Sequence, residues 1–72
     1  MLSKEFFRDR LRALRKELKE TQKQTAAAVG IAERHYQKIE AGESLPGLEY
    51  FCALADHFEV SADYLLGRTD ER

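Results

Sequence analysis

The stretch "QKQTAAAVGIAERHYQKIEAG", residues 22–42, decides how this chain folds, because its helical pattern is interrupted once in the middle. Small and apolar residues recur at helical spacing up to Val29, stop at Gly30 and resume at Ile31. A glycine inside a helix costs about 1 kcal/mol relative to alanine. Glycine does, however, accept the left-handed backbone geometry that other residues resist. The pattern therefore predicts two short helices joined by a tight turn.

The residues around Gly30 are those that a helix-turn-helix requires. Two helices that cross steeply need a small side chain where their backbones approach, and Ala26 has that position. The second helix must be anchored through one face, which Tyr36 and Ile39 provide. We therefore predict helices over about 22–29 and 32–41, with the second helix presenting its other face to the outside.

That outer face carries several kinds of hydrogen-bonding side chain. Projection at 100° per residue places Glu33, Arg34, Gln37 and Lys38 away from Ile39. In the major groove, arginine can bind guanine, glutamine can bind adenine, and glutamate can accept from the amino group of cytosine. These four residues are candidate base contacts, and an ordinary solvated helix face is the alternative interpretation.

The rest of the chain predicts further helices and no strands. Ser3 can cap a helix over about 3–19, Thr21 can cap the helix over 22–29, and Ser61 can cap a short helix over 62–66. A helix over 48–58 follows Pro46, with an apolar face made of Leu48, Phe51, Cys52, Ala55 and Phe58. The prediction is a single all-α domain spanning residues 1–72, with five helices, a core over about 3–67 and a frayed tail over 68–72.

Composition excludes several functional classes. The single cysteine forbids an intramolecular disulfide, and one cysteine with two histidines does not predict a metal site. We expect no cofactor, no enzymatic activity, no membrane span and a cytoplasmic location. Cys52 is expected to be a small core residue, with a thiol sensor as the alternative.

The net charge of −1 hides an uneven distribution. Residues 1–41 hold ten Lys and Arg against six Asp and Glu, a net charge of +4. Residues 42–72 hold two against seven, a net charge of −5. This asymmetry indicates a basic binding face with an acidic rear, and a chance difference between solvated faces is the alternative.

Four motifs together resemble one family, the XRE/Cro-type, lambda-repressor-like helix-turn-helix regulators of bacteria and phages. They are "LRALRKELKETQKQTAAAVGI", "YQKIEAGES", "LPGLEYFCALADHF" and "VSADYLLG", in order along residues 11–67. The resemblance implies a compact five-helix DNA-binding domain that acts as a transcriptional regulator. The simplest form is a dimeric repressor on a pseudo-palindromic operator of double-stranded DNA.

The resemblance also implies roles for individual residues. Glu33, Arg34 and Lys38 match base-reading positions, and Gln37 lies between them. Arg15 and Glu40 match a pair that links the first helix to the end of the third, which we interpret as a structural salt bridge. Contacts to the DNA backbone are expected from Gln22, Lys23, His35 and Ser44, although His35 equally suits a half-buried packing role.

Several residues depart from the family pattern. Thr25 and Glu20 stand where apolar residues are usual, Ala32 replaces a capping hydroxyl, and Glu43 and Ser44 lie in a loop that is often basic. Phe58, Tyr64, Leu65 and Leu66 are the expected self-association surface, or else they complete the core. The acidic second half favours one alternative function, a protein-interaction module such as an antitoxin or adaptor that keeps the fold.

Overall fold

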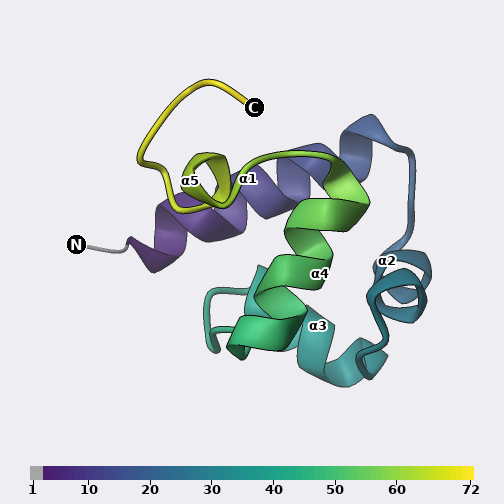
Figure 1. Ribbon diagram of the computed structural model, residues 1–72. Helices are drawn as coiled ribbons and strands as arrows, with labels where there is room; N and C mark the ends of the chain where they lie inside the picture. The colour runs from purple at the N-terminus through teal and green to yellow at the C-terminus, as the bar shows by residue number, and fades with distance from the viewer. Residues whose placement is uncertain (1–2) are drawn as a thin grey trace.

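The computed structural model describes residues 3–72, and these residues contain helices joined by short loops (Figure 1). In chain order, the helices are α1 (Lys4–Glu17), α2 (Gln22–Val29), α3 (Glu33–Glu40), α4 (Leu48–Phe58) and α5 (Ala62–Leu65). Residues 3–72 thus form the all-α, five-helix bundle that the sequence predicted. Within residues 3–72, no helix has both the length and the apolar character needed to cross a membrane.

Local capping explains where these helices begin. The Ser3 hydroxyl accepts a hydrogen bond from the Phe6 amide, and the Ser61 hydroxyl accepts one from the Tyr64 amide. Thr21 and Gln24 form a reciprocal capping box at the start of α2. These side chains satisfy amide groups that have no partner within the first turn of a helix. The N-terminal ends of α1, α2 and α5 therefore follow directly from the sequence.

The turn between α2 and α3 depends on backbone geometry at Gly30, whose φ is +81°. The amides of Gly30 and Ile31 both donate to the Ala26 carbonyl, at 2.9 and 3.0 Å, which closes the end of α2. The chain then re-enters a helix at Glu33, one residue later than predicted. Ala32 precedes it without a side-chain capping bond.

The core lies where α1, α3 and α4 meet, between the helix-turn-helix and α5. Phe7, Leu11, Tyr36, Ile39 and Leu54 are each at most 2% exposed. Figure 1 shows α4 passing across the middle of the bundle, with α2 and α3 at one end and α5 against α1 at the other. The helix-turn-helix is thus supported from behind by α1 and α4.

The predicted inner face of α4 was partly wrong. Leu48 is 79% exposed and Cys52 is also exposed, whereas Leu54 is fully buried. Leu48 is the first residue of α4, where the helix has not yet reached the core. The buried face follows Leu54, Ala55 and Phe58, and it leaves Cys52 outside the core.

Two further stretches differ from prediction: the end of α1 and the tail over residues 68–72. α1 ends at Glu17 because Leu18 closes it and Lys19 turns to a φ of +59°, which leaves Leu18 half exposed. Residues 68–72 were predicted to fray, but they turn back over α5 (Figure 1). The Ser61 amide donates to the Arg72 carbonyl at 2.7 Å, and the Arg72 guanidinium pairs with Glu17 at 2.6 Å.

Candidate nucleic-acid interface

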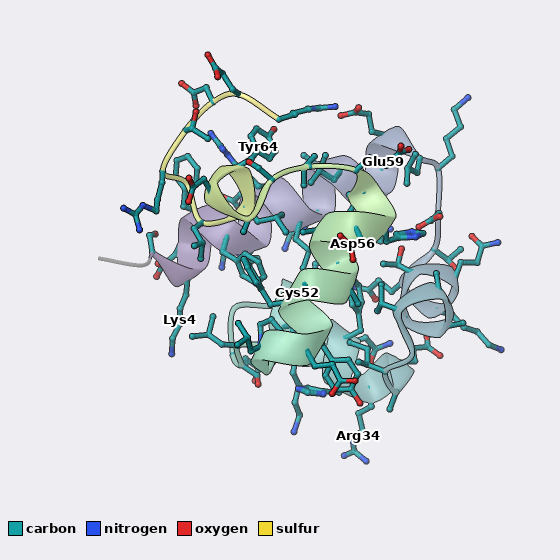
Figure 2. The ribbon with its side chains drawn as sticks, in the orientation of Figure 1. Lys4, Arg34, Cys52, Asp56, Glu59 and Tyr64 are labelled. Carbon is teal, nitrogen blue, oxygen red and sulfur yellow. The ribbon has the colours of Figure 1, made fainter. Side chains whose placement is uncertain are left out.

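The outward face of α3 is exposed to solvent. Glu33, Arg34, Gln37 and Lys38 are all exposed, while Tyr36, Ile39 and Glu40 are buried on the opposite face. Figure 2 shows Arg34 extending away from every other helix. The structure therefore brings the four predicted base contacts together on one accessible helix face. That face offers both donors and acceptors to a groove.

Two side-chain contacts lie on this face or beside it. The Gln37 amide donates to the Glu33 carboxylate at 3.4 Å, one helical turn earlier. His35 is half buried, and the edge of its ring contacts Tyr50 of α4 with ring centroids 6.4 Å apart. His35 therefore takes the packing position that was the alternative to a phosphate contact, while part of its ring stays accessible.

The first turn of α2 lies next to the C-terminal end of α3. Lys23 is exposed, and Gln22 is half buried with its amide donating to the Glu40 carboxylate at 3.3 Å. Gln22 is thus held by the protein and keeps one amide hydrogen and its oxygen for an outside partner. Ser44 is half buried in the loop between α3 and α4, beside the exposed Glu43.

A buried ion pair fixes α3 against α1. The Arg15 guanidinium binds the Glu40 carboxylate through two hydrogen bonds of 2.8 and 2.9 Å, and Glu40 is only 2% exposed. Burial opposes ionisation of Glu40, but the Arg15 hydrogen bonds and charge outweigh it and lower the Glu40 pKa. The same pairing raises the pKa of Arg15. The pair predicted from the sequence is present, and both groups keep their charges at neutral pH.

Two further groups complete the surroundings of Glu40. The Arg12 guanidinium lies 3.8 Å from its carboxylate and donates to its backbone carbonyl at 3.3 Å. The Tyr36 hydroxyl is buried without a hydrogen-bond partner among residues 3–72. Burial and then the Glu40 carboxylate raise the pKa of Tyr36, so the phenol stays protonated. Glu40 therefore joins α1, α2 and α3 at one point behind the outward face.

The sequence did not predict a second polar cluster, which lies between α2 and the end of α4. The Glu20 carboxylate accepts from the Thr25 hydroxyl at 2.7 Å and lies 2.8 Å from Nε2 of His57. We call these residues the Glu20–Thr25–His57 cluster. Glu20 and Thr25 stood out as polar residues at apolar positions. Their link to His57 crosses 37 residues of chain, so only the fold could show it.

The predicted self-association surface needs correction. Phe58 is 8% exposed and Leu65 is fully buried, because both complete the chain's own core. Tyr64 is half buried and its ring is covered by the Arg10 guanidinium, 4.1 Å from the ring centroid. Of the four residues, Leu66 alone borders an open apolar surface.

That surface is a groove of about 270 Å³ between α1, the α3–α4 loop and the start of α4. We call it the apolar groove, and its lining residues are Phe7, Leu45, Pro46, Leu48, Phe51 and Leu66. Leu45 and Leu48 are 39% and 79% exposed, so the groove opens to the outside. Large exposed apolar side chains gathered in one place are typical of a contact surface.

Together, the tight α2–Gly30–α3 turn, the buried Arg15–Glu40 pair and the exposed face of α3 define a helix-turn-helix domain. A family model described as Helix-turn-helix (HTH_3) matches residues 11–65. The chain belongs to this helix-turn-helix family.

Known proteins similar to this chain are regulators. The cryptic phage CTXphi transcriptional repressor RstR of Vibrio cholerae is 44% identical over 66 residues, 89% of this chain and 59% of that protein. The uncharacterized HTH-type transcriptional regulator YobD of Bacillus subtilis is 45% identical over 62 residues, 86% of this chain and 55% of that protein. The chain thus spans little more than half the length of these curated relatives.

Among solved structures, the P22 c2 repressor in complex with synthetic operator 9T superposes with a TM-score of 0.83. It is 33% identical to this chain, and the match covers 89% of this chain and 97% of that one. The similarity extends over the helix-turn-helix and the supporting helices alike.

Proposed function

We propose that this domain binds double-stranded DNA in a sequence-specific way and acts in transcriptional regulation, with α3 in the major groove. The observation that carries the proposal is the outward face of α3, where Glu33, Arg34, Gln37 and Lys38 are all exposed. An α-helix matches the width of the major groove, and these side-chain types can distinguish base pairs there. The role is one of binding, without a catalytic step or a cofactor.

The similar proteins support this proposal. RstR is a transcriptional repressor, and the P22 c2 repressor is in complex with a synthetic operator. The positions of Lys23 and the held Gln22 beside α3 add candidate contacts to the DNA backbone, and the accessible part of His35 and the Ser44 hydroxyl add two more. Occupancy of an operator is the simplest way for such a domain to repress.

The direct test is selection of bound sequences from a random DNA pool, followed by titration of the selected duplex at several salt concentrations. We expect an enriched motif and an affinity that falls steeply with salt, because phosphate contacts release counterions. Equal affinity for selected and random duplexes, with no dependence on salt, would contradict the proposal.

We further propose that two copies pair through the apolar groove. The loop that forms one wall of the groove, residues 41–47, continues directly from α3. A dimer that binds a pseudo-palindrome must present its two α3 helices to half-sites about 34–36 Å apart, and a contact surface that adjoins the end of α3 suits this requirement. The apolar groove is also the observation that favours the alternative function, in which a different protein binds this domain. We assign the groove to a second copy of the chain because a dimer serves DNA binding.

The dimer predicts a specific effect of Leu48→Glu. A charge at this 79% exposed position should leave the monomer folded but disfavour burial of the groove against another copy. We expect sedimentation to show fewer dimers and operator binding to lose its cooperativity. Leu18→Glu, at a half-exposed leucine outside the groove, is the matched control. Equal self-association of both variants and the wild type would rule out this surface.

A further inference from the structure

A second arginine of α1, Arg12, reaches the same residue of α3 as Arg15 but is held there differently. Arg15 binds both carboxylate oxygens of Glu40, at 2.8 and 2.9 Å. The Arg12 guanidinium lies 3.8 Å from Oε1 of Glu40, beyond hydrogen-bond distance, and donates instead to the Glu40 backbone carbonyl at 3.3 Å. The Arg12 side chain is 44% exposed, whereas that of Arg15 is 14% exposed. The Arg12 guanidinium is therefore fixed at the end of α3 with part of its surface open to solvent.

The charges of these three side chains do not cancel. Arg12 and Arg15 carry two positive charges and Glu40 carries one negative charge, so a net charge of +1 remains. The short bonds from Arg15 already satisfy the Glu40 carboxylate, so Arg12 adds a cation that the buried pair does not need. The carbonyls at the C-terminal end of a helix attract cations, which explains why Arg12 is held at this end of α3.

The position of Arg12 is next to the first turn of α2. The Gln22 amide donates at 3.3 Å to Oε1 of Glu40, the same oxygen that lies 3.8 Å from the Arg12 guanidinium. Gln22 is a candidate contact to the DNA backbone, and it keeps one amide hydrogen for an outside partner. A phosphate that accepts this hydrogen lies close to the exposed part of Arg12. Arginine suits such a partner because its guanidinium forms strong, charge-assisted hydrogen bonds with phosphate oxygens.

The loop that follows α3 does not provide this charge itself. Residues 41–47 include the exposed Glu43 and contain no lysine or arginine. The Arg8 side chain of α1 packs against this loop, but its guanidinium is paired with the Asp9 carboxylate at 3.2 Å. Cations near the DNA backbone supply much of the affinity of a DNA-binding protein. Arg12 is thus the α1 residue best placed to supply such a cation at the end of α3.

We propose that Arg12 binds a DNA phosphate beside Gln22 and so supplies, from α1, a backbone contact that the α3–α4 loop lacks. A contact with phosphate fixes the position of the protein on the duplex and carries no direct sequence information. Arg12 therefore contributes to affinity for any duplex, while the outward face of α3 contributes the sequence preference. The inference depends on the proposed function, since it adds a contact to the same binding surface.

Titrations at several salt concentrations test this contact, with the selected duplex and with a duplex of unrelated sequence. Because each phosphate contact changes the slope of log affinity against log salt by about 0.9, Arg12→Gln should reduce the slope by that amount. Binding to both duplexes should weaken by the same factor, whereas Arg12→Lys should keep the wild-type slope. Arg68→Gln, at an exposed arginine after α5, is the matched control and should leave slope and affinity unchanged.

Two results of these titrations would overturn the proposal. An unchanged slope in Arg12→Gln, even with weaker binding, would mean that Arg12 only holds the end of α3 in place. A loss confined to the selected duplex would mean that Arg12 contacts a base edge. A wild type that binds neither duplex instead contradicts the proposed function itself.

A measurement on the wild type covers the case in which melting curves show that Arg12→Gln is not folded. The Nε–H resonance of Arg12 should shift upon addition of either duplex, because a phosphate then joins its guanidinium. The corresponding resonance of Arg68 should not move. An Arg12 resonance that neither duplex changes, although both bind, overturns the proposed contact.

Discussion

At the scale of single residues, the most consequential side chain is the buried carboxylate of Glu40. It receives hydrogen bonds from α1 and α2 while belonging to α3, so its charge joins three helices. Its lowered pKa gives the sign of the pH effect. Stability from this group is present above the ordinary pKa of a glutamate and is lost as pH falls through the lower, folded-state value.

Replacement of Arg15 by methionine should destabilise the domain strongly. The change leaves the Glu40 carboxylate buried without its main partner, which costs about 3–5 kcal/mol of the free energy of unfolding. Urea unfolding measures this cost. Lys16→Met is the control, because Lys16 is exposed on the same helix and should change stability by less than about 0.5 kcal/mol. Similar unfolding free energies for the two variants would show that the ion pair does not hold α3 in place.

Arg34→Ala should affect DNA recognition rather than folding. Arg34 is exposed and extends into solvent, so its loss should not change the melting temperature. We expect the selected operator to bind about 1–3 kcal/mol less tightly, with relaxed preference at one base pair. Arg68→Ala removes an exposed arginine that lies after α5 and is the matched control. An unchanged base preference in Arg34→Ala would remove this residue from the recognition surface.

At the scale of helices, the sequence predicted what local chemistry determines. The bounds of α2 and α4 and the caps Ser3, Thr21 and Ser61 follow from neighbouring residues, and the structure confirms them. The exposure of Cys52 and Leu48 depends instead on where α4 meets the other helices. In a helix of 11 residues, the apolar side chains allow more than one face to be buried. Only packing against the other helices selects the face that contains Leu54.

The turn at Gly30 gives a prediction of different mechanisms for two glycines. Gly30 has a φ of +81° and open space where a side-chain carbon would lie, so Gly30→Ala suffers from backbone strain alone, at about 1–2 kcal/mol. Gly47 also has open space but a φ of −65°, so Gly47→Ala meets no backbone strain; because Gly47 is the N-cap of α4, where glycine is preferred to alanine, we expect a loss of stability of less than about 1 kcal/mol. Thermal unfolding of both variants measures the two changes in stability. Equal shifts in melting temperature would contradict the role of left-handed geometry at the turn.

At the scale of the whole molecule, most contacts between distant segments were beyond sequence reasoning; the Arg15–Glu40 pair, which the family resemblance implied, is the exception. The tail, the apolar groove and the Glu20–Thr25–His57 cluster all join parts of the chain that are far apart in sequence. The Arg10 guanidinium illustrates this, because it bonds the Thr69 carbonyl at 2.5 Å and lies over the rings of Phe6 and Tyr64. Neither a charge count nor a helical period places such partners, so residues 68–72 were wrongly expected to fray.

The candidate recognition face, by contrast, was accessible to prediction because it is set by one helix and one turn. Its polar residues were identified from their angle to Ile39, and the structure leaves all four exposed. The fold adds the reason that the face stays free: α1 packs behind α3, α4 packs against α2, and the buried Arg15–Glu40 pair holds α3 in place.

Mapping of amide chemical-shift changes upon addition of the selected duplex tests this account most directly. We expect the largest changes along the exposed side of α3, with further changes in the first turn of α2 and the loop after α3. Amides of α5 and of residues 68–72 should shift little. Changes concentrated on α5 and the tail, with α3 unaffected, would contradict the assignment of the helix-turn-helix as the surface that binds DNA.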